Sequence, residues 1–345
     1  MPSSRHDLSF EELAALPALA GQPAYRARQV WDGFYAQLAD LDDISALPKA
    51  LRAELSVQPE LQAALTEQTR QEADGGTTVK WLFGLAGGEA IETVLMHYPG
   101  RTTVCVSSQA GCAMACGFCA TGQAGFRRHL SAGEIVEQVV RAAREAKATE
   151  RRLSNIVFMG MGEPLANYDA TWGAVTRIHE SLGISARHIT ISTVGIVPGI
   201  HKLAQENLPV GLAVSLHAAN DKLRNELVPV NRRYPLATLI AACRGYIGNR
   251  NRRLSFEWAC IAGVNDRTQD ADELAEVATA LGAHVNLIPL NPTPGYLVMG
   301  STRAAVHTFA QALRDRDVNV TVRQTRGSSI DAACGQLATQ RQRRH

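Results

Sequence analysis

Three cysteine thiols stand within eight residues of one another, in a pattern suited to binding a metal. Cys112, Cys116 and Cys119 form a C-x3-C-x2-C pattern directly after a β-like run at 103–108. A structural zinc site usually takes four ligands and a complete [4Fe-4S] cluster takes four cysteines, so three thiolates leave one coordination position open. The spacing therefore predicts an open, reactive metal centre. A zinc knuckle that lacks one ligand, or three packed core cysteines, are the alternatives.

Four more cysteines lie outside this pattern. Cys105 is in the β-like run and Cys334 is near the end of the chain, whereas Cys243 and Cys260 have no context beyond packing. Taken alone, the sequence around Cys105 indicates a small buried strand residue, and that around Cys334 a loop thiol.

The composition is typical of a globular protein. The chain has 345 residues, 46% of them hydrophobic, and a formal net charge of +2. Its first residues lack an apolar signal core, and no stretch approaches about eighteen uninterrupted apolar residues, so we expect neither secretion nor membrane spanning. The odd count of seven cysteines fits free thiols in the reducing cytoplasm better than a disulfide framework.

Basic residues gather in short groups, although the net charge gives no global argument for a polyanionic partner. Such groups could contact RNA phosphates or be solvated faces and a frayed tail. A basic and aromatic segment at 25–31 leaves the same choice between RNA contact and packing of Trp31 into its own core. The basic groups are Arg127-Arg128-His129, Arg232-Arg233, Arg250–Arg253 and Arg341–His345.

The predicted secondary structure changes along the chain from helices to alternating strands and helices. Residues from about 8 to 70 have helical spacing, and 78–83 with 90–96 predict a hairpin. Beyond it, β-branched runs alternate with helical patterns, which indicates a parallel β/α architecture. The predicted strands are 103–108, 155–159, 188–192, 211–216, 254–258, 284–290 and 318–323. The helical patterns between them include 132–147, 168–182, 236–246, 269–281 and 303–314.

These elements predict an α/β fold built on a partial barrel. About six strand–helix units and one final strand are too few for eight closed units, so we expect an open parallel β/α barrel with a side mouth wide enough for a macromolecule. We expect a small helical accessory domain at 1–75, a β-hairpin linker at 76–97 and a core domain at 98–345.

Polar residues follow several predicted strands, at the barrel edge where chemistry occurs. Gly162 and Glu163 follow the second strand of the core, and Asn291 follows the sixth. Singly each is explained by an ordinary turn or cap, but together they ring one face. Glu92, in the hairpin, is on this evidence only a weak candidate for a base.

Several motifs resemble those of the radical S-adenosylmethionine (SAM) superfamily. The cysteine pattern with an aromatic residue, Phe118, before its last thiol resembles the superfamily signature. Longer motifs resemble the bacterial RNA adenine methyltransferases of that superfamily, in particular those that methylate adenine C2 in large-subunit ribosomal RNA and in transfer RNA. Ser328-Ser329 departs from the pattern, since relatives often carry acidic residues there. The motifs are 105–112, 158–167, 215–221 and 325–337, with 25–31 and 47–52 near the start, so the likeness covers nearly the whole chain.

The resemblance implies a cofactor set and its binding residues. In the superfamily, three cysteines bind a [4Fe-4S] cluster, SAM occupies the fourth iron, and reduction yields a 5'-deoxyadenosyl radical. By this likeness Gly162 and Glu163 contact the SAM amine, and Ser192 lies near its ribose and carboxylate. The cluster ligands are then Cys112, Cys116 and Cys119, and the remaining SAM contacts are Ser215, Leu216, His217 and Asn291.

The resemblance also implies a route through two thiols that uses two SAM molecules per turnover. Adenine C2 is electron-poor, so ordinary displacement on SAM cannot methylate it. In the family, a cysteine matched by Cys334 is methylated first, and its methylene radical then adds to the adenine. A base matched by Glu92, with Cys105 as the runner-up, removes the ring proton. Cys105 then attacks sulfur and releases the RNA as a transient disulfide forms.

The substrates implied by the resemblance are 23S rRNA and tRNA, at the adenine next to the anticodon. We further expect a flavodoxin- or ferredoxin-type electron donor, a cytoplasmic location and a monomer. Two alternatives stay open: a relative that methylates adenine C8 and confers antibiotic resistance, and a non-catalytic, zinc-bearing RNA-binding protein.

Overall fold

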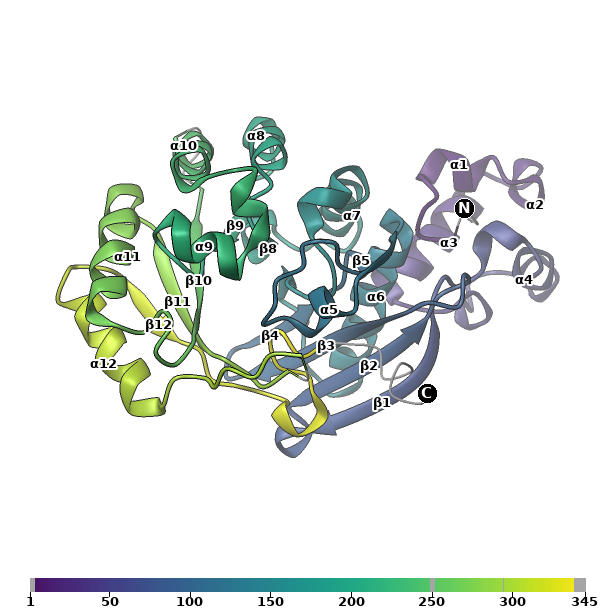
Figure 1. Ribbon diagram of the computed structural model, residues 1–345. Helices are drawn as coiled ribbons and strands as arrows, with labels where there is room; N and C mark the ends of the chain where they lie inside the picture. The colour runs from purple at the N-terminus through teal and green to yellow at the C-terminus, as the bar shows by residue number, and fades with distance from the viewer. Residues whose placement is uncertain (1–3, 249–251, 294, 338–345) are drawn as a thin grey trace.

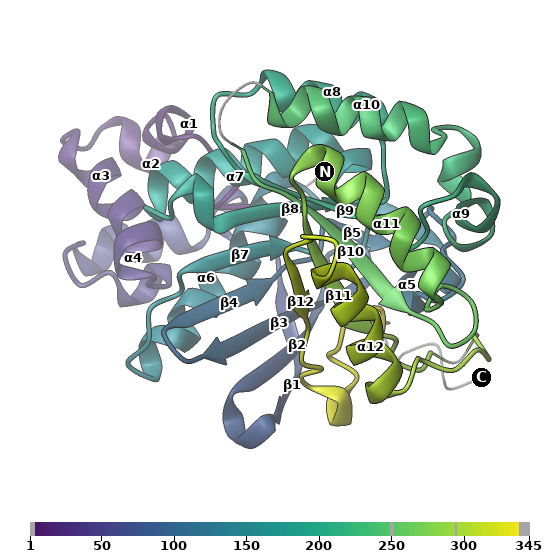
Figure 2. The ribbon, with the colours of Figure 1, turned by 90° about the vertical axis from the view of Figure 1, so that its left-hand side faces the viewer.

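The computed structural model describes residues 4–248, 252–293 and 295–337. Its central feature is a ten-stranded sheet with the order β1-β2-β3-β4-β7-β8-β9-β10-β11-β12. All pairings from β4 through β12 are parallel, and those among β1 to β4 are antiparallel. Figures 1 and 2 show the sheet curving, with helices along its outer side.

The parallel strands match the runs expected from the sequence. No pairing closes β1 onto β12 within the described part of the chain, so the expected open parallel β/α barrel is confirmed. The bounds of its strands are β4 Arg101–Cys105, β7 Asn155–Phe158, β8 Ile189–Thr193, β9 Gly211–Ser215, β10 Leu254–Cys260, β11 His284–Pro289 and β12 Val320–Val322.

The connecting helices follow the apolar spacing in the sequence. The longest begins at a capping box, in which the Ser131 hydroxyl accepts from the Glu134 N–H and the Glu134 carboxylate accepts from the Ser131 N–H. All five core helices named from the sequence are present, and α5, α8 and α9 are additional. The core helices are α5 Ala120–Gln123, α6 Ala132–Ala148, α7 Tyr168–Ser181, α8 Val197–Gln205, α9 Asp221–Leu227, α10 Leu236–Ile247, α11 Thr268–Leu281 and α12 Arg303–Arg314.

Three antiparallel strands extend the barrel sheet at its first edge. They are β1 Thr66–Ala73, β2 Thr78–Gly84 and β3 Ala90–Tyr98, so the predicted hairpin is present and is continuous with the barrel through β4. The helical expectation was wrong for 66–70, which belong to β1. This edge strand is almost wholly exposed, and its Glu and Gln residues favour a helix until cross-strand pairing overrides that preference.

The N-terminal helices pack against the outer side of the core. They are α1 Phe10–Ala14, α2 Pro17–Ala20, α3 Tyr25–Asp32 and α4 Lys49–Ser56. Asp7 accepts from the Gly133 N–H and the Ser131 hydroxyl at the start of α6, and the Arg177 guanidinium of α7 donates to the Tyr35 hydroxyl at 3.0 Å. Trp31 packs against Tyr35 with ring centroids 4.7 Å apart, so it is part of this small core. The expected division of the chain at 75 and 97 stays a prediction.

The remaining elements are short. A second, two-stranded sheet pairs β5 Gln109–Gly111 with β6 Phe126–His129, on either side of the cysteine motif. No helix in the described residues is long and apolar enough to span a membrane. The short helical turns are η1 Gly33–Gln37, η2 Leu41–Asp43, η3 Pro59–Leu61, η4 Asp74–Gly76, η5 Pro164–Asn167, η6 Ala186–His188, η7 Pro229–Arg232 and η8 Ser328–Ile330.

Candidate active site

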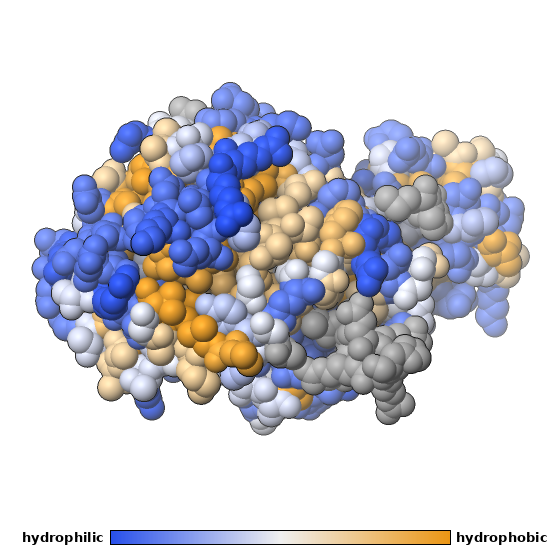
Figure 3. All heavy atoms as spheres, in the orientation of Figure 1, coloured by the Kyte–Doolittle hydropathy of each residue, from blue (hydrophilic) through white to orange (hydrophobic). Residues whose placement is uncertain are grey.

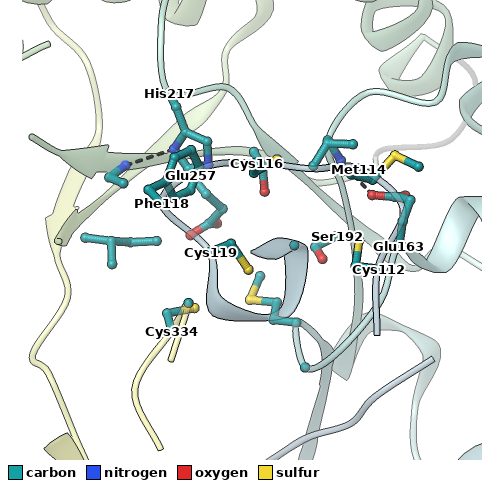
Figure 4. A pocket seen from close by; sticks show the side chains of 18 of the residues that line it. Cys112, Met114, Cys116, Phe118, Cys119, Glu163, Ser192, His217, Glu257 and Cys334 are labelled. Atoms are coloured by element: carbon teal, nitrogen blue, oxygen red, sulfur yellow. Dashed lines mark hydrogen bonds between the residues drawn. The ribbon is translucent and has the colours of Figure 1, made fainter. Parts of the chain in front are cut away.

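A cavity with an empty volume of about 970 Å³ opens at the carboxyl ends of the barrel strands. Most of the residues predicted to form the site line it. Figure 4 shows Cys334 coming from the C-terminal segment, across the cavity from Glu163 and Cys112. The predicted residues that line the cavity are Cys112, Cys116, Cys119, Gly162, Glu163, Ser192, Ser215, His217, Asn291 and Cys334.

The three clustered thiols are presented by the loop between β5 and α5. Cys112 and Cys116 are buried and Cys119 is half-buried. Phe118 packs edge-on against the His217 ring, with centroids 4.8 Å apart, and this contact fixes the loop against the barrel. The Cys112 N–H donates to the Gly125 carbonyl, so the second sheet closes the base of the loop.

The donor set of this loop fits an iron–sulfur cluster. Burial raises the pKa of Cys112 to about 12 and also raises the pKa of Cys116, so these thiols hold their protons until a cation replaces them. Among the described residues, no three His, Cys, Asp or Glu side chains are placed to hold one metal ion. The thiolates of a cluster bind different irons and need not converge on one point.

Gly162 and Glu163 form the turn after β7. Gly162 has φ +101°, and a Cβ there would lie 2.6 Å from the Gln109 Cβ, so the turn requires glycine. The Glu163 carboxylate accepts from the N–H groups of Leu165 and Val194. Burial raises its pKa to about 7, although the Val194 hydrogen bond opposes that shift. Glu163 is therefore a buried acid on the cavity wall and a cap for η5.

The ends of β8 and β9 contribute a hydroxyl and a neutral imidazole. The Ser192 hydroxyl donates to the Phe158 carbonyl at 2.6 Å. Burial lowers the pKa of His217 to about 3. Its Nδ1 accepts from the Ala259 N–H at 2.9 Å, so the proton of the neutral ring is on Nε2. Leu216 is fully buried and does not line the cavity, so its expected contact with SAM would have to use the main chain.

Cys334 lies on a loop that is hydrogen-bonded to the cluster side of the site. The Asn291 amide donates to the Cys334 carbonyl at 3.1 Å, and the Ala120 N–H, directly after Cys119, donates to the Gly335 carbonyl at 2.8 Å. Cys334 is an exposed residue, and it lines the cavity. Surrounding protein nevertheless raises its pKa by desolvation, and the charge of Arg323 opposes that effect.

A second cavity, which we call the two-thiol cavity, joins the two isolated thiols. Both Cys105 and Cys334 line it, and it shares Met159 and Asn291 with the first cavity. Burial raises the pKa of Cys105 to about 12, nearby Cys334 adds to the rise, and Arg323 opposes it. All seven cysteines are free thiols in this structure. Cys334 therefore stands at the junction between the cluster loop and Cys105.

Glu92 lies outside the lining of both cavities. It is 2% exposed, and its Oε1 lies 3.0 Å from the Lys80 Nζ. The pairing of β2 with β3 brings the two residues together, since Lys80 lies opposite Val94 and Glu92 lies opposite Leu82. The candidate base is thus beside the two-thiol cavity, in a buried ion pair.

Three charged residues near the site were not singled out from the sequence. Glu257 of β10 lines the first cavity and lies 3.7 Å from Arg323, which lines the second. Arg224 is fully buried and donates to the carbonyls of Leu216 and Val194, behind the cavity wall. The sequence offers a signal for Glu257, a charged residue inside the otherwise apolar strand β10, which needs a partner. It offers none for Arg224, which lies in a mostly polar helix.

The basic groups fall into different classes in the structure. Arg128 forms a two-pronged ion pair with Glu134, and the Arg252 guanidinium donates to the Leu203 carbonyl, so both are structural. Arg127 is exposed, and the group at 341–345 lies outside the described residues.

Leu297 and Met299, in the loop after β11, are also exposed, and Figure 3 shows apolar surface on this face among hydrophilic residues.

Comparisons with known proteins place the chain in a family. Residues 106–278 match the radical SAM superfamily. A probable dual-specificity RNA methyltransferase RlmN from Frankia alni is 50% identical over 98% of this chain and 84% of its own length. One of the same description from Chloroflexus aurantiacus is 50% identical over 96% of this chain and 92% of its own.

A solved structure agrees with these relatives. The crystal structure of a radical SAM methyltransferase from Sphaerobacter thermophilus superposes with a TM-score of 0.94 and is 52% identical, covering 97% of this chain and 99% of that one. Identity at this level over nearly the whole chain extends beyond the barrel to the N-terminal helices and the Cys334 loop. The chain therefore belongs to the radical SAM superfamily and, within it, to the RlmN family of RNA methyltransferases.

Proposed function

We propose that this protein methylates C2 of adenine in 23S rRNA and in tRNA next to the anticodon, with Cys334 as the methyl carrier. The observation that carries the proposal is the place of Cys334 at the junction of two cavities, one lined by the cluster cysteines and the other by Cys105. The curated relatives are described as dual-specificity RNA methyltransferases, which supports an RNA substrate of both kinds.

The cofactors of this superfamily are a [4Fe-4S] cluster and SAM, which together supply a carbon radical when bound and reduced. In this chain Cys112, Cys116 and Cys119 would hold the cluster, and their common loop presents all three to one cavity. Glu163, Ser192 and the Nε2–H of His217 are polar groups on the same wall, suited to the amine, carboxylate and ribose of SAM. Gly162, Ser215, Leu216 and Asn291 complete the proposed contacts.

The two isolated thiols have separate tasks in this proposal. Cys334 is exposed in the cavity and carries the methyl carbon on its sulfur, so the adenine becomes bonded to that carbon. Glu92 takes the proton from C2 as the radical adduct gives up one electron, which the cluster would accept when bound. Cys105 then attacks the Cys334 sulfur, and its thiol proton goes to the methylene carbon as the sulfur–carbon bond breaks. This leaves a methyl group on the RNA and a disulfide that an external dithiol reduces between turnovers. Both thiols line one cavity, so this attack needs no large movement of the barrel.

Substitution of the two thiols tests the proposal directly. With cluster-loaded protein, isotope-labelled SAM and rRNA, Cys334→Ala should lose at least about 99% of 2-methyladenosine formation, since the carrier atom is gone. Cys105→Ala should instead accumulate RNA bonded to protein. Cys243→Ala, which removes a buried thiol of α10 that lines neither cavity, is the matched control. Full methylation by Cys334→Ala would contradict the two-thiol route.

The position of the methyl group on the ring has a separate test. Digested rRNA is compared by chromatography and mass spectrometry with 2-methyladenosine and 8-methyladenosine. We expect only the former, and finding only the latter would replace our assignment with the C8 activity. The proposal also includes a monomer in the cytoplasm, where these RNAs are found, and a flavodoxin- or ferredoxin-type electron donor.

A further inference from the structure

Lys80 is a buried charge to which neither the sequence motifs nor the proposed roles assign a task. It lies in β2 with its side chain 4% exposed, and its Nζ is 3.0 Å from the Glu92 Oε1. The same ammonium donates to the main-chain carbonyl of Asp331 at 3.3 Å. Burying a lysine is unfavourable unless its hydrogens find partners. Here one partner is the candidate base and the other is on the loop of Cys334.

The strand register places Lys80, Glu92 and Cys105 on one face of the sheet. Lys80 lies opposite Val94, and Val94 lies opposite Cys105 on the next strand. Directly opposed residues point to the same side, and Glu92 is two residues from Val94, so it shares that side as well. Val94 and Cys105 both line the two-thiol cavity, which identifies this face as the one turned toward it.

The Cys334 loop is anchored to the same strands. The Gly327 N–H donates to the Asp74 carboxylate at 2.9 Å, in the turn between β1 and β2. The Ala332 N–H donates back to the Gly327 carbonyl at 2.9 Å, which folds the loop over β2. Asp331, the residue that Lys80 contacts, is three positions before Cys334. The contact from Lys80 therefore links this loop to the Glu92 carboxylate.

We propose that Lys80 is a positioning residue, whose ammonium ties the Glu92 carboxylate to the loop that carries Cys334. The inference rests on the proposed function, in which Glu92 takes a proton from an adenine bonded to the Cys334 methyl carbon. A base must lie within hydrogen-bond reach of the proton that it removes. Because Cys334 places the adenine, its loop and the base must be held relative to each other, and one ammonium with three donors does this.

An ion pair that only stabilises the sheet would behave differently. The antiparallel ladder between β2 and β3 is complete from Thr78 to Gly84 without the ion pair, and a sheet-stabilising lysine would not need the Asp331 carbonyl. Loss of a purely structural pair would loosen β2 and β3. Loss of a contact that holds the Cys334 loop would instead loosen residues 327–334 and leave the strands in place.

Hydrogen exchange in cluster-free protein separates these cases. We expect Lys80→Met to speed amide exchange in peptides covering 327–334 about tenfold, with β2 and β3 unchanged, and Lys80→Arg to restore most of the protection. Lys222→Met, an exposed lysine of α9, is the matched control. If Lys80→Met does not fold, the pair Glu92→Gln and Glu92→Gln/Lys80→Met makes the same comparison without a charged carboxylate that has lost the ammonium beside it.

Single-turnover assays of the loaded enzyme give the second readout. We expect Lys80→Met to methylate Cys334 within about twofold of the wild-type rate. Release of RNA that contains 2-methyladenosine should then be about tenfold slower, and RNA bonded to Cys334 should accumulate. Glu92→Gln should accumulate the same adduct, and Lys80→Arg should release RNA faster than Lys80→Met.

The outcomes distinguish this inference from the proposed function. Suppose that the wild-type protein methylates RNA and that Lys80→Met matches it both in amide hydrogen exchange and in the rate of RNA release. That result would overturn the role of Lys80 and leave the proposed function standing. Faster exchange spread over β2 and β3 would also overturn it, in favour of a structural ion pair. A wild-type protein that methylates no RNA would instead overturn the proposed function, whatever the exchange result.

Discussion

Cys105 and Cys334 are the same side chain in different surroundings, and the surroundings suit their different tasks. Cys334 is exposed to two cavities and can meet a large substrate. Cys105 is buried on the sheet, with its pKa raised to about 12 by burial, so it keeps its proton and remains unreactive until a partner sulfur reaches it. This difference in exposure agrees with the order of the proposed steps.

Glu163 gives a prediction that pH can test. Burial raises its pKa from 4.5 to about 7, so the folded state binds a proton more tightly than the unfolded state does. The stability linked to this proton is present below about pH 4.5 and is lost as pH rises through 7. The shift corresponds to about 3 kcal/mol. Urea unfolding of cluster-free protein should show Glu163→Gln gaining about that much relative to wild type between pH 4 and pH 8.

The control for this prediction is Glu206→Gln, which removes a half-buried carboxylate at the end of α8. A stability difference between Glu163→Gln and wild type that is constant with pH would show that the Glu163 carboxyl titrates normally.

The placement of single residues was only partly predictable. Asn291 and His217 could be assigned to one face because parallel strands end at the same edge. Sequence periodicity does not identify partners across strands, so the pairing of Lys80 with Glu92 was missed. Glu92 was expected in the site, and it lies outside the lining of both cavities, although Val94 of the same strand lines the second.

At the scale of elements, the turn after β7 requires a residue without a side chain. Gly162→Ala combines a φ of +101° with a Cβ 2.6 Å from the Gln109 Cβ, so we expect a loss of about 3 kcal/mol in the free energy of unfolding. Gly245→Ala, in α10 with open space around its Cβ, should gain about 0.5–1 kcal/mol because alanine favours helices. Thermal unfolding of both variants gives the comparison.

An unchanged melting temperature for Gly162→Ala would mean that the turn can shift away from β5.

The element predictions succeeded where the local pattern is strong. α6 has both helical apolar spacing and a capping box, and β7 is a short β-branched run. α8 is not among the helices named from the sequence, and Pro198 and Gly199 in its first turn resemble a loop. Edge strand β1 was missed because pairing, rather than its own composition, makes it a strand.

At the scale of the whole molecule, the N-terminal helices depend on the core for their position. Arg177 of α7 donates to the Tyr35 hydroxyl, and its guanidinium lies 4.9 Å from the Trp31 ring. The aromatic segment at 25–31 therefore faces the protein through Trp31, whereas Tyr25 is 55% exposed beside Arg26. Any RNA contact by this part would use the outward side of α3.

Arg177→Ala tests this attachment. We expect the change to cost roughly 2 kcal/mol, since charge-assisted hydrogen bonds and a stacked cation are lost, and to make residues 4–61 more sensitive to limited proteolysis. Methylation of Cys334 should persist, while RNA methylation falls if these helices bind RNA. Arg187→Ala, at an exposed position, is the control, and equal proteolysis of the two variants would contradict the prediction.

The strand register around Glu92 limits where the chain can tolerate insertions and deletions. The side chains of a strand alternate between two faces, so deleting one residue between Glu92 and Val94 would turn the acid away from the face that carries Lys80 and Cys105. Lengthening the exposed turn at Gly87-Gly88 would leave that alignment unchanged. We therefore expect members of the family to differ in the length of this turn but to keep the same number of residues between Glu92 and Cys105.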